Sequence, residues 1–287
     1  MIPLKRVIIL FCLFLVFSSN TTLIFSIEAS YFRTTRYSHE SIVEKKSLSR
    51  PELFILSQRL ILYEKPHSPP PELGYPVLFL LHGASQYPFS WFFPFNSWSI
   101  QQSRFSEKAI DAGFFIVAPS SGRPINPGPH AWSSFIDDVN ESEDLKLFNT
   151  LFNWLENDVY FPIDLDHVFC AGFSSGGFMT SRLAKEFPDR FSGVLVHSGT
   201  DADSITFTPR GPEFDCNSPL NYSKDHPPTL VVHGEKDRLV PYECGLHFFE
   251  ELQRHNITSS LLTDTENGHI WLSLQSEDML QWFESLL

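Results

Sequence analysis

Cysteine is scarce in this sequence, because the 287 residues include only four. They form no CxxC pair and no Cys/His cluster with metal-ligand spacing, and no HExxH motif occurs. We therefore expect neither a metal nor a cofactor. Cys170 lies in an apolar stretch, where a thiol packs as a small hydrophobic group. Cys216 and Cys244 remain as a candidate bridge, which the sequence alone leaves open.

Positive charge is scarce too, since 21 lysines and arginines face 34 aspartates and glutamates, for a formal net charge of −13. The acidic residues are scattered rather than gathered in a tail. A phosphate backbone attracts clustered positive charge, so we expect no nucleic acid partner. Aromatic residues are abundant, with 28 Phe, 8 Tyr and 6 Trp, and 42% of the residues are hydrophobic, which indicates a globular protein.

Charge is absent from residues 7–27, which follow Lys5 and Arg6. Two basic residues, the apolar run 7–17 and then small residues are typical of a secretory signal peptide. A membrane anchor is the alternative, because 21 uncharged residues could cross a bilayer. We expect residues 1–30 to be a signal peptide or membrane anchor and residues 31–50 to be a flexible segment. The expected location is secreted or lumenal, with a single-pass anchored protein as the alternative, and three N-x-S/T tripeptides are candidate glycan sites there: Asn140, Asn221 and Asn256.

From residue 51 onward, short apolar runs alternate with longer stretches of helical spacing. The predicted strands are 76–81, 114–118, 167–171, 193–197, 229–233 and 260–262, after an opening strand or hairpin at 53–63, and the predicted helices are 143–160, 177–187 and 242–254. Runs without polar alternation are typical of strands buried on both faces of a parallel sheet. We expect one domain, 51–287, built as a mostly parallel, doubly wound α/β sheet with helices on both faces. Residues 86–104 and 200–228 lack a clear period and are predicted loops at the carboxyl ends of strands, where ligands bind.

The stretch CAGFSSGGF, residues 170–178, contains two adjacent serines between glycines. A nucleophilic serine on a sharp strand-to-helix turn needs small residues two positions before and after it. Ser174 meets this requirement with Gly172 and Gly176, whereas Ser175 has a phenylalanine on one side. An apolar strand precedes the motif and a helical pattern follows it, which is the required context. We expect Ser174 to be the nucleophile and Ser175 to offer its backbone N–H to the oxyanion.

An orienting acid and a base are expected after the nucleophile, in that order along the chain. Asp237 follows the apolar run TLVV and lies deeper in the next turn than its nearest competitor, Glu235. Its short side chain can there reach back toward a histidine. His269, in the turn TENGHIW after the last predicted strand, can take the proton from Ser174 while Asp237 holds its tautomer. Two other histidines follow the nucleophile, and both fit a surface or packing role: His247 and His255.

A second oxyanion donor is expected in the loop after an early strand. The stretch VLFLLHGASQ supplies this loop, and the backbone N–H of Ala84 is our candidate. His82 lies in the same stretch, but a base at this point would break the expected chain order. We therefore expect His82 to stabilise the loop, and the same interpretation applies to His233.

These motifs together resemble the α/β-hydrolases, and within them the polyhydroxybutyrate depolymerase and feruloyl esterase type of secreted serine esterase. The resemblance covers roughly residues 76–272 and is carried by VLFLLHGASQ, GFFIVAPSS, FPIDLDHVFCAGFSSGGFMTSRLAKEFPDRFSGVLVHSG, TLVVHGEKDRLVPY and NGHIW. It implies the α/β-hydrolase fold, a triad of Ser174, Asp237 and His269, and Ala84 and Ser175 as oxyanion donors. The family often has a cysteine in place of Ala84, and a glycine-rich, proline-containing run where this chain has TENGHIWLS.

The leading hypothesis is a secreted serine esterase that hydrolyses hydroxyalkanoate, feruloyl or other acyl esters through an acyl-enzyme. Its expected partner is an ester substrate, small or polymeric. Aromatic residues are candidates to line its pocket, although packing in the core is the simpler explanation for at least half of them. The candidate substrate-binding residues are Trp91, Trp98, Trp132 and Trp271.

Two alternatives keep the fold and change the activity. A prolyl-oligopeptidase-like peptidase shares the G-x-S-x-G-G motif and the chain order of acid and base. It ranks lower because about 45 residues between the leader and the core leave no room for a gating domain. A non-catalytic receptor or adhesion module ranks lowest, because no member of the triad is missing.

Overall fold

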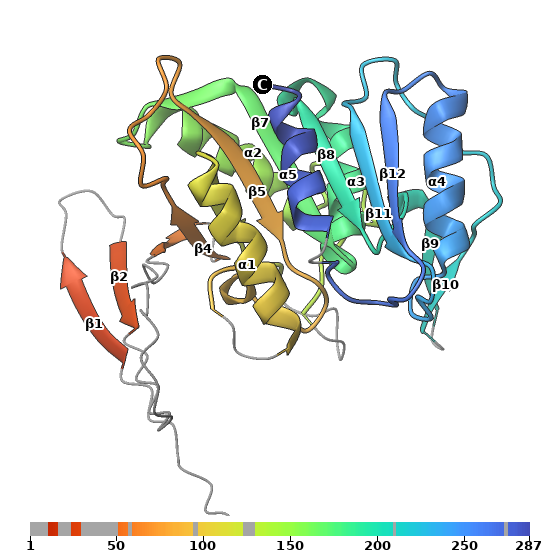
Figure 1. The fold of residues 1–287 in the computed structure, drawn as a ribbon, viewed down its shortest axis with the longest axis horizontal. Coiled ribbons are helices and arrows are strands. Elements are labelled where there is room, and N and C mark those ends of the chain that lie inside the picture. The colour runs from red at the N-terminus through yellow and green to blue at the C-terminus, as the bar shows by residue number, and fades with distance from the viewer. Residues whose placement is uncertain are drawn as a thin grey trace, which may run out of the picture.

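The computed structural model describes residues 11–16, 24–29, 51–56, 59–93, 97–122, 130–208, 211–272 and 275–287. A ten-stranded sheet has the order β1-β2-β3-β4-β6-β5-β7-β8-β11-β12 (Figure 1). Its strands are β1 (Phe11–Val16), β2 (Ile24–Ala29), β3 (Glu52–Leu56), β4 (Arg59–Glu64), β5 (Tyr75–Leu81), β6 (Phe115–Pro119), β7 (Ile163–Phe173), β8 (Gly193–His197), β11 (Thr229–Gly234) and β12 (Ser259–Asp264). The α-helices are α1 (Ser97–Asp111), α2 (Glu143–Asn157), α3 (Ser175–Glu186), α4 (Tyr242–Arg254) and α5 (Ser276–Glu284). Short 3₁₀ helices are η1 (Pro88–Trp91), η2 (Pro188–Arg190) and η3 (Ala202–Ser204), and a separate hairpin joins β9 (Ile205–Thr208) to β10 (Gly211–Phe214).

The core of the sheet is parallel. Strands β6, β5, β7, β8, β11 and β12 pair side by side in the same direction. Every residue of β5 and β8 is buried, as expected of strands covered on both faces. The hairpin of β3 and β4, which the sequence predicts at 53–63, adds antiparallel strands beside β6. The prediction of a mostly parallel, doubly wound sheet is therefore confirmed.

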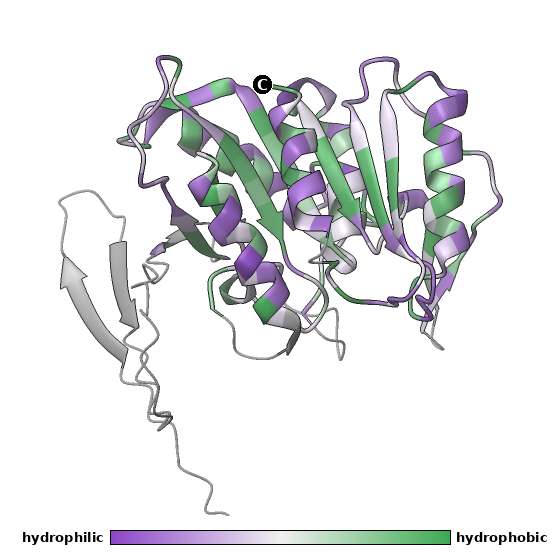
Figure 2. Ribbon diagram, in the orientation of Figure 1, coloured by the Kyte–Doolittle hydropathy of each residue, from purple (hydrophilic) through white to green (hydrophobic). Residues whose placement is uncertain are grey.

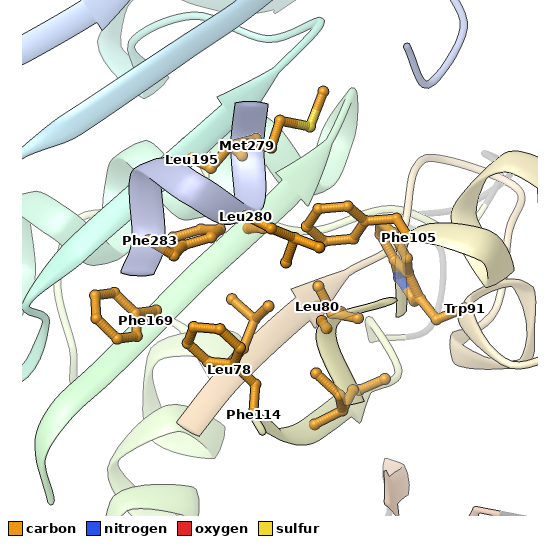
Figure 3. Close-up of a cluster of buried hydrophobic side chains, with 14 of the residues drawn as sticks. Leu78, Leu80, Trp91, Phe105, Phe114, Phe169, Leu195, Met279, Leu280 and Phe283 are labelled. Carbon is orange, nitrogen blue, oxygen red and sulfur yellow. The ribbon is translucent and has the colours of Figure 1, made fainter. Parts of the chain in front are cut away.

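Helices cover both faces of the sheet (Figure 1), and hydrophilic residues alternate with hydrophobic residues along them (Figure 2). Successive residues of β5 point to opposite faces, and they enter different core clusters. Leu78 packs with Phe105 of α1 and Phe283 of α5 on one face (Figure 3). Phe79 packs with Phe148 of α2 on the other face, in the cluster that also receives α3. Because the helices fill both faces, the carboxyl edge of the sheet is the place where loops can build a site.

Two stretches expected to be loops contain regular structure. Much of 86–104 is taken up by η1 and the start of α1, and 200–228 contains the hairpin of β9 and β10. The buried residues of α1 include the polar Ser99, Gln102 and Ser106. Because polar residues occupy part of the buried face, apolar residues do not recur at clear helical spacing, and the sequence pattern does not predict this helix. The pattern missed α5 as well.

Cys216 and Cys244 form a disulfide, with their Cα atoms 4.4 Å apart. The bridge ties the segment after β10 to the first turn of α4. Cys170 is free and buried in β7, and burial raises the pKa of its thiol to about 12. A thiol with such a pKa is not reactive at neutral pH, so Cys170 is a packing residue, as the sequence predicts.

Within the leader expected at residues 1–30, the structure describes β1 and β2, which pair with each other and, through β2, with β3. The flexible segment expected at residues 31–50 lies outside the described residues. No helix in the described part of the chain is both long enough and apolar enough to cross a membrane. The role of residues 1–30 as a leader or anchor stays a prediction.

Candidate active site

Ser174 lies between the end of β7 and the start of α3, at the carboxyl edge of the sheet. Its φ of 54° lies in the left-handed region, which a residue other than glycine rarely adopts. A Cβ on Gly172 would overlap the carbonyl of Gly176, and a Cβ on Gly176 would overlap the carbonyl of Leu81. The flanking glycines are therefore sterically required, and together they form a tight elbow around one serine.

His269 connects Ser174 to Asp237. Its Nε2 lies 2.8 Å from the Ser174 Oγ, and its Nδ1 lies 2.7 Å from the Asp237 Oδ2. An ionised carboxylate only accepts hydrogen bonds, so Nδ1 carries the proton and Nε2 is free to accept the serine proton. A nucleophile, a base and an orienting acid require these distances and this tautomer.

Asp237 is held by the turn that follows β11. Its Oδ1 accepts hydrogen bonds from two backbone N–H groups of that turn, at 2.9 and 3.0 Å. Burial raises the pKa of Asp237, but hydrogen bonds from His233 and His269 outweigh burial, and the pKa lies well below its usual range. The carboxylate therefore stays charged at neutral pH. Glu235, the competing acid in the sequence, is exposed.

Two backbone N–H groups near the elbow are available to an oxyanion. Those of Ala84 and Ser175 have no acceptor within the described part of the chain. Ala84 lies in the loop after β5, and Ser175 is the first residue of α3, where N–H groups have no partner inside the helix. A Cβ on Gly176 would meet the carbonyls of Leu81 and His82, so the loop after β5 lies against the elbow. Both candidate donors are thus at the same edge of the sheet.

His82 and Trp132 hold the loop after β5 in place. His82 donates from Nδ1 to the Gly83 carbonyl at 2.8 Å, and its Nε2 accepts from the Ser121 backbone N–H at 3.0 Å. Burial lowers the pKa of His82 to about 4, so the ring is neutral at pH 7 and keeps this acceptor. Trp132 donates its indole N–H to the His82 carbonyl at 2.9 Å and its backbone N–H to the Ser175 Oγ at 3.0 Å. His82 therefore stabilises the loop, as the sequence predicts, and Trp132 bridges the two candidate oxyanion segments.

The substrate-binding role expected of the tryptophans is wrong for the three whose side chains are described. Trp91, Trp132 and Trp271 are 0%, 2% and 2% exposed, so they belong to the core. Trp91 and Trp271 pack edge to face with ring centroids 4.9 Å apart. Burial of large aromatic surfaces is strongly favourable, and a sequence does not separate a core tryptophan from one that lines a pocket. The side chain of Trp98 lies outside the described residues.

The remaining histidines singled out in the sequence have packing contacts. His233, His247 and His255 each bond to a backbone carbonyl, at 3.0, 2.8 and 2.9 Å respectively. His233 also lies 3.4 Å from the Asp237 carboxylate and so supports the acid. Over the described ranges, no group of three or more His, Cys, Asp and Glu side chains is placed to hold a metal ion.

A small apolar cluster beside the three residues was not predicted from the sequence. Ile205 and Phe214 of the hairpin pack with Phe178 and Val240. Phe178 follows Ser174 by one helical turn, and the Val240 N–H bonds to Asp237, so this cluster adjoins the nucleophile and the acid. The hairpin strands are only four residues long and one contains a proline, which leaves little signal for a strand prediction.

His197, the last residue of β8, was not predicted to belong to the site either. Its carbonyl accepts from the Ser174 N–H at 2.9 Å, and its ring Nε2 accepts from the Leu272 N–H at 2.9 Å. The run LVHSG gives no sign of these contacts, because they depend on strand order and on the path of a distant loop.

The chain matches one protein family and is similar to two kinds of known enzyme. A model of the prolyl oligopeptidase family matches residues 129–287. A poly(3-hydroxyoctanoate) depolymerase of Pseudomonas fluorescens is 28% identical over 247 residues, which cover 80% of this chain and 81% of that protein. A probable dipeptidyl-peptidase 5 of Aspergillus clavatus is 27% identical over 237 residues, which cover 74% of this chain and 31% of the peptidase. This chain thus spans about a third of the length of that second relative.

Solved structures share the fold. A ferulic acid esterase has 17% identity and a TM-score of 0.56, with 80% of this chain and 92% of that chain covered. The acylaminoacyl peptidase of Pyrococcus horikoshii has 16% identity and a TM-score of 0.58, with 93% of this chain and 48% of that chain covered. The α/β-hydrolase fold and the resemblance to the depolymerase type are confirmed, and the ferulic acid esterase shares the fold.

Proposed function

Because this chain belongs to the prolyl oligopeptidase family and is an α/β-hydrolase, we propose that it is a serine hydrolase that cleaves carboxylic esters through an acyl-enzyme. In this proposal Ser174 is the nucleophile, His269 the base and Asp237 the orienting acid. One observation supports it above all others. A continuous line of hydrogen bonds runs from the Ser174 hydroxyl through His269 to Asp237, at 2.8 and 2.7 Å.

The proposed reaction has two halves. The Ser174 Oγ attacks the ester carbonyl carbon while His269 Nε2 takes its proton, and the Asp237 carboxylate stabilises the imidazolium. The carbonyl oxygen becomes an oxyanion that accepts hydrogen bonds from the N–H groups of Ala84 and Ser175. Collapse of this intermediate breaks the C–O bond, and His269 protonates the leaving alcohol. Water, deprotonated by His269, then attacks the acyl-enzyme, and Ser174 regains its proton as the acid is released.

We favour ester substrates, with hydroxyalkanoate esters first among them. The depolymerase of Pseudomonas fluorescens aligns with this chain over 81% of its own length, whereas the dipeptidyl-peptidase aligns over 31% of its own length. A relative that aligns over most of its length supports a shared substrate class better than one that aligns over a part. Feruloyl esters come second, because the ferulic acid esterase shares the fold at 17% identity.

A serine peptidase is the second candidate, and the family assignment favours it. The same triad and oxyanion donors cleave amides when the histidine protonates the leaving amine. The family model matches residues 129–287, which include the three candidate catalytic residues, and the dipeptidyl-peptidase match covers 74% of this chain. Ester and amide substrates must therefore be assayed side by side.

We also propose that residues 1–30 direct the chain into the secretory pathway and that it carries N-linked glycans. The asparagines of all three N-x-S/T tripeptides, Asn140, Asn221 and Asn256, are exposed. The Cys216–Cys244 disulfide suits an oxidising compartment. Protein recovered from the medium of eukaryotic cells should begin after the leader and lose mass on treatment with an N-glycosidase. Protein that stays in the cytosol with an intact leader would contradict this proposal.

Hydrolysis assays test the proposed activity. Purified protein and its Ser174→Ala variant are compared on nitrophenyl esters of graded length, dispersed poly(3-hydroxyoctanoate), a feruloyl ester and aminoacyl nitroanilides. We expect turnover of esters to exceed that of amides and to disappear in the variant. Faster cleavage of the nitroanilides would replace the esterase by the peptidase. No turnover of any of these substrates by the parent protein would contradict both.

A further inference from the structure

His197 lies between the elements that carry the nucleophile and the acid. It ends β8, which pairs with β7 on one side and with β11 on the other. The Ser174 N–H donates to the His197 carbonyl at 2.9 Å, so the backbone of the elbow is fixed to the end of this strand. The next residue, Ser198, has a φ of 48° and bonds through its own N–H to the Val232 carbonyl at 2.8 Å. The end of β8 is thus anchored on both sides.

The side chain of His197 holds the end of the loop that carries His269. Its Nε2 accepts from the Leu272 N–H at 2.9 Å, and its ring stacks on Trp271 with centroids 4.4 Å apart and planes at 21°. Both partners follow His269 within three residues. The ring is fully buried, and burial lowers its pKa well below the usual value. The ring is therefore neutral, and Nε2 keeps the lone pair that the Leu272 N–H needs.

The other end of this loop is fixed separately. The Asn267 carbonyl accepts from the Lys236 N–H at 3.0 Å, next to Asp237. His269 therefore lies between an anchor on the acid side and an anchor at His197. Phe173 packs against both histidines, with its ring centroid 5.5 Å from that of His197 and 5.1 Å from that of His269.

We propose that His197 is a positioning residue that sets the distance between the Ser174 Oγ and the His269 Nε2. Its carbonyl holds the backbone of the nucleophile, and its ring holds the loop of the base. The inference rests on the proposed function, because it assigns a role within the same triad. His197 has no contact with reacting atoms in this scheme and acts through Ser174 and His269.

Three substitutions separate the ring's functions. His197→Phe keeps a flat ring for Trp271 and removes the acceptor for Leu272. In His197→Gln the side-chain amide reaches the position of Nε2, so its oxygen can again accept from the Leu272 N–H. In His197→Asn the shorter amide reaches only the position of Nδ1 and cannot. The matched control is His226→Phe. His226 is another buried histidine, 7% exposed, and it lies away from the triad, where its ring bonds to the Pro227 carbonyl at 2.9 Å.

Turnover is measured per active site titrated with a fluorophosphonate, together with KM and the pH profile of kcat/KM. We expect His197→Phe and His197→Asn to lower kcat about 100-fold with KM within about threefold, because a shift of about 1 Å in the base has that effect. The acidic limb of the pH profile should shift in both variants. His197→Gln should recover kcat to within about tenfold of the parent, and His226→Phe should leave kcat unchanged.

A merely structural role for His197 predicts another result, in which fewer sites titrate but each site keeps the parent kcat and pH profile. That outcome would overturn the inference, as would an equal loss of kcat in His226→Phe. If His197→Phe does not fold, Trp271→Leu removes the stacking partner instead, and an unchanged kcat there would count equally against it. Failure of the proposed function is distinct, because the parent protein itself would then neither turn over esters nor take up the fluorophosphonate.

Discussion

Ser174 lies in a tight elbow that needs a glycine on each side and is bonded to the end of β8, whereas His269 is held by residues that lie far from it along the chain. The elbow is closed by Gly172 and Gly176, where any Cβ would overlap backbone carbonyls. The His269 loop is held by a carboxylate on the turn after β11 and by the ring of His197 at the end of β8. The nucleophile is therefore fixed by steric fit of the elbow together with one hydrogen bond to β8, and the base is fixed by hydrogen bonds from its loop to β8 and to the turn after β11.

This difference has a consequence for function. The elbow tolerates little movement, because its two glycines leave no space around the turn. The base depends on how β8, β11 and the loop after β12 are arranged relative to one another. We therefore expect substitutions around His269 to change turnover before they change folding, and substitutions in the elbow to affect both.

The largest expected effect is on the elbow serine. Ser174→Ala should lower kcat at least about 10⁴-fold, because among the described residues the hydroxyl that bonds to His269 is that of Ser174. The matched control is Ser175→Ala, which keeps the backbone N–H and removes only the acceptor of the Trp132 N–H, a loss of about 1 kcal/mol. Ester hydrolysis measures both. An inactive Ser175→Ala beside an active Ser174→Ala would reverse the assignment.

On the base side, Asp237→Asn should lower kcat about 10⁴-fold with little loss of stability, since the amide favours the wrong tautomer of His269. Glu235→Gln is the control, because this exposed neighbour has no expected part in the reaction. Steady-state kinetics and thermal unfolding of both variants measure the two effects. Equal activity of Asp237→Asn and Glu235→Gln would remove Asp237 from the site.

The elbow could be predicted from the sequence more completely than the contacts that hold the base. The elbow, the strand before it and the helix after it were predicted from one contiguous stretch, because their geometry depends on glycine positions and apolar runs. Asp237 and His269 were selected by chain order and turn position, and the structure brings both to Ser174. His197 and the hairpin of β9 and β10 were missed, and the tryptophans were assigned to a pocket instead of the core. These depend on which distant segments pack together, which a single sequence does not encode locally.

Glycine substitutions compare the two regions directly. Gly176→Ala should reduce the free energy of unfolding by more than about 3 kcal/mol, because its Cβ would overlap a backbone carbonyl. In the base loop, a Cβ on Gly268 would lie 3.0 Å from the Lys236 carbonyl oxygen, and Gly268→Ala should cost about 1 kcal/mol. Denaturant unfolding measures both costs. A larger loss for Gly268→Ala would contradict the idea that the elbow is the sterically rigid region.

Acid should destabilise the fold through two buried neutral histidines: His82, next to the loop after β5, and His226, which lies away from the triad. Burial lowers the pKa of each to about 4, so in the unfolded chain each binds a proton that the folded chain does not bind. Their stabilising contribution is complete above about pH 6.5 and is lost as the pH falls from there toward 4. His226→Phe should therefore reduce the drop in unfolding free energy between pH 7 and pH 5 by about 2 kcal/mol. Urea unfolding at the two pH values measures it, and an unchanged drop would contradict a lowered pKa.

We expect His269 to activate one serine of the adjacent pair, Ser174. The most direct measurement is to label the protein with a fluorophosphonate and to locate the added mass by tandem mass spectrometry of the peptide that contains both serines. We expect the mass on Ser174, and we expect labelling to fall to background in a His269→Ala variant. Mass on Ser175, or labelling that is as fast without His269, would contradict the account.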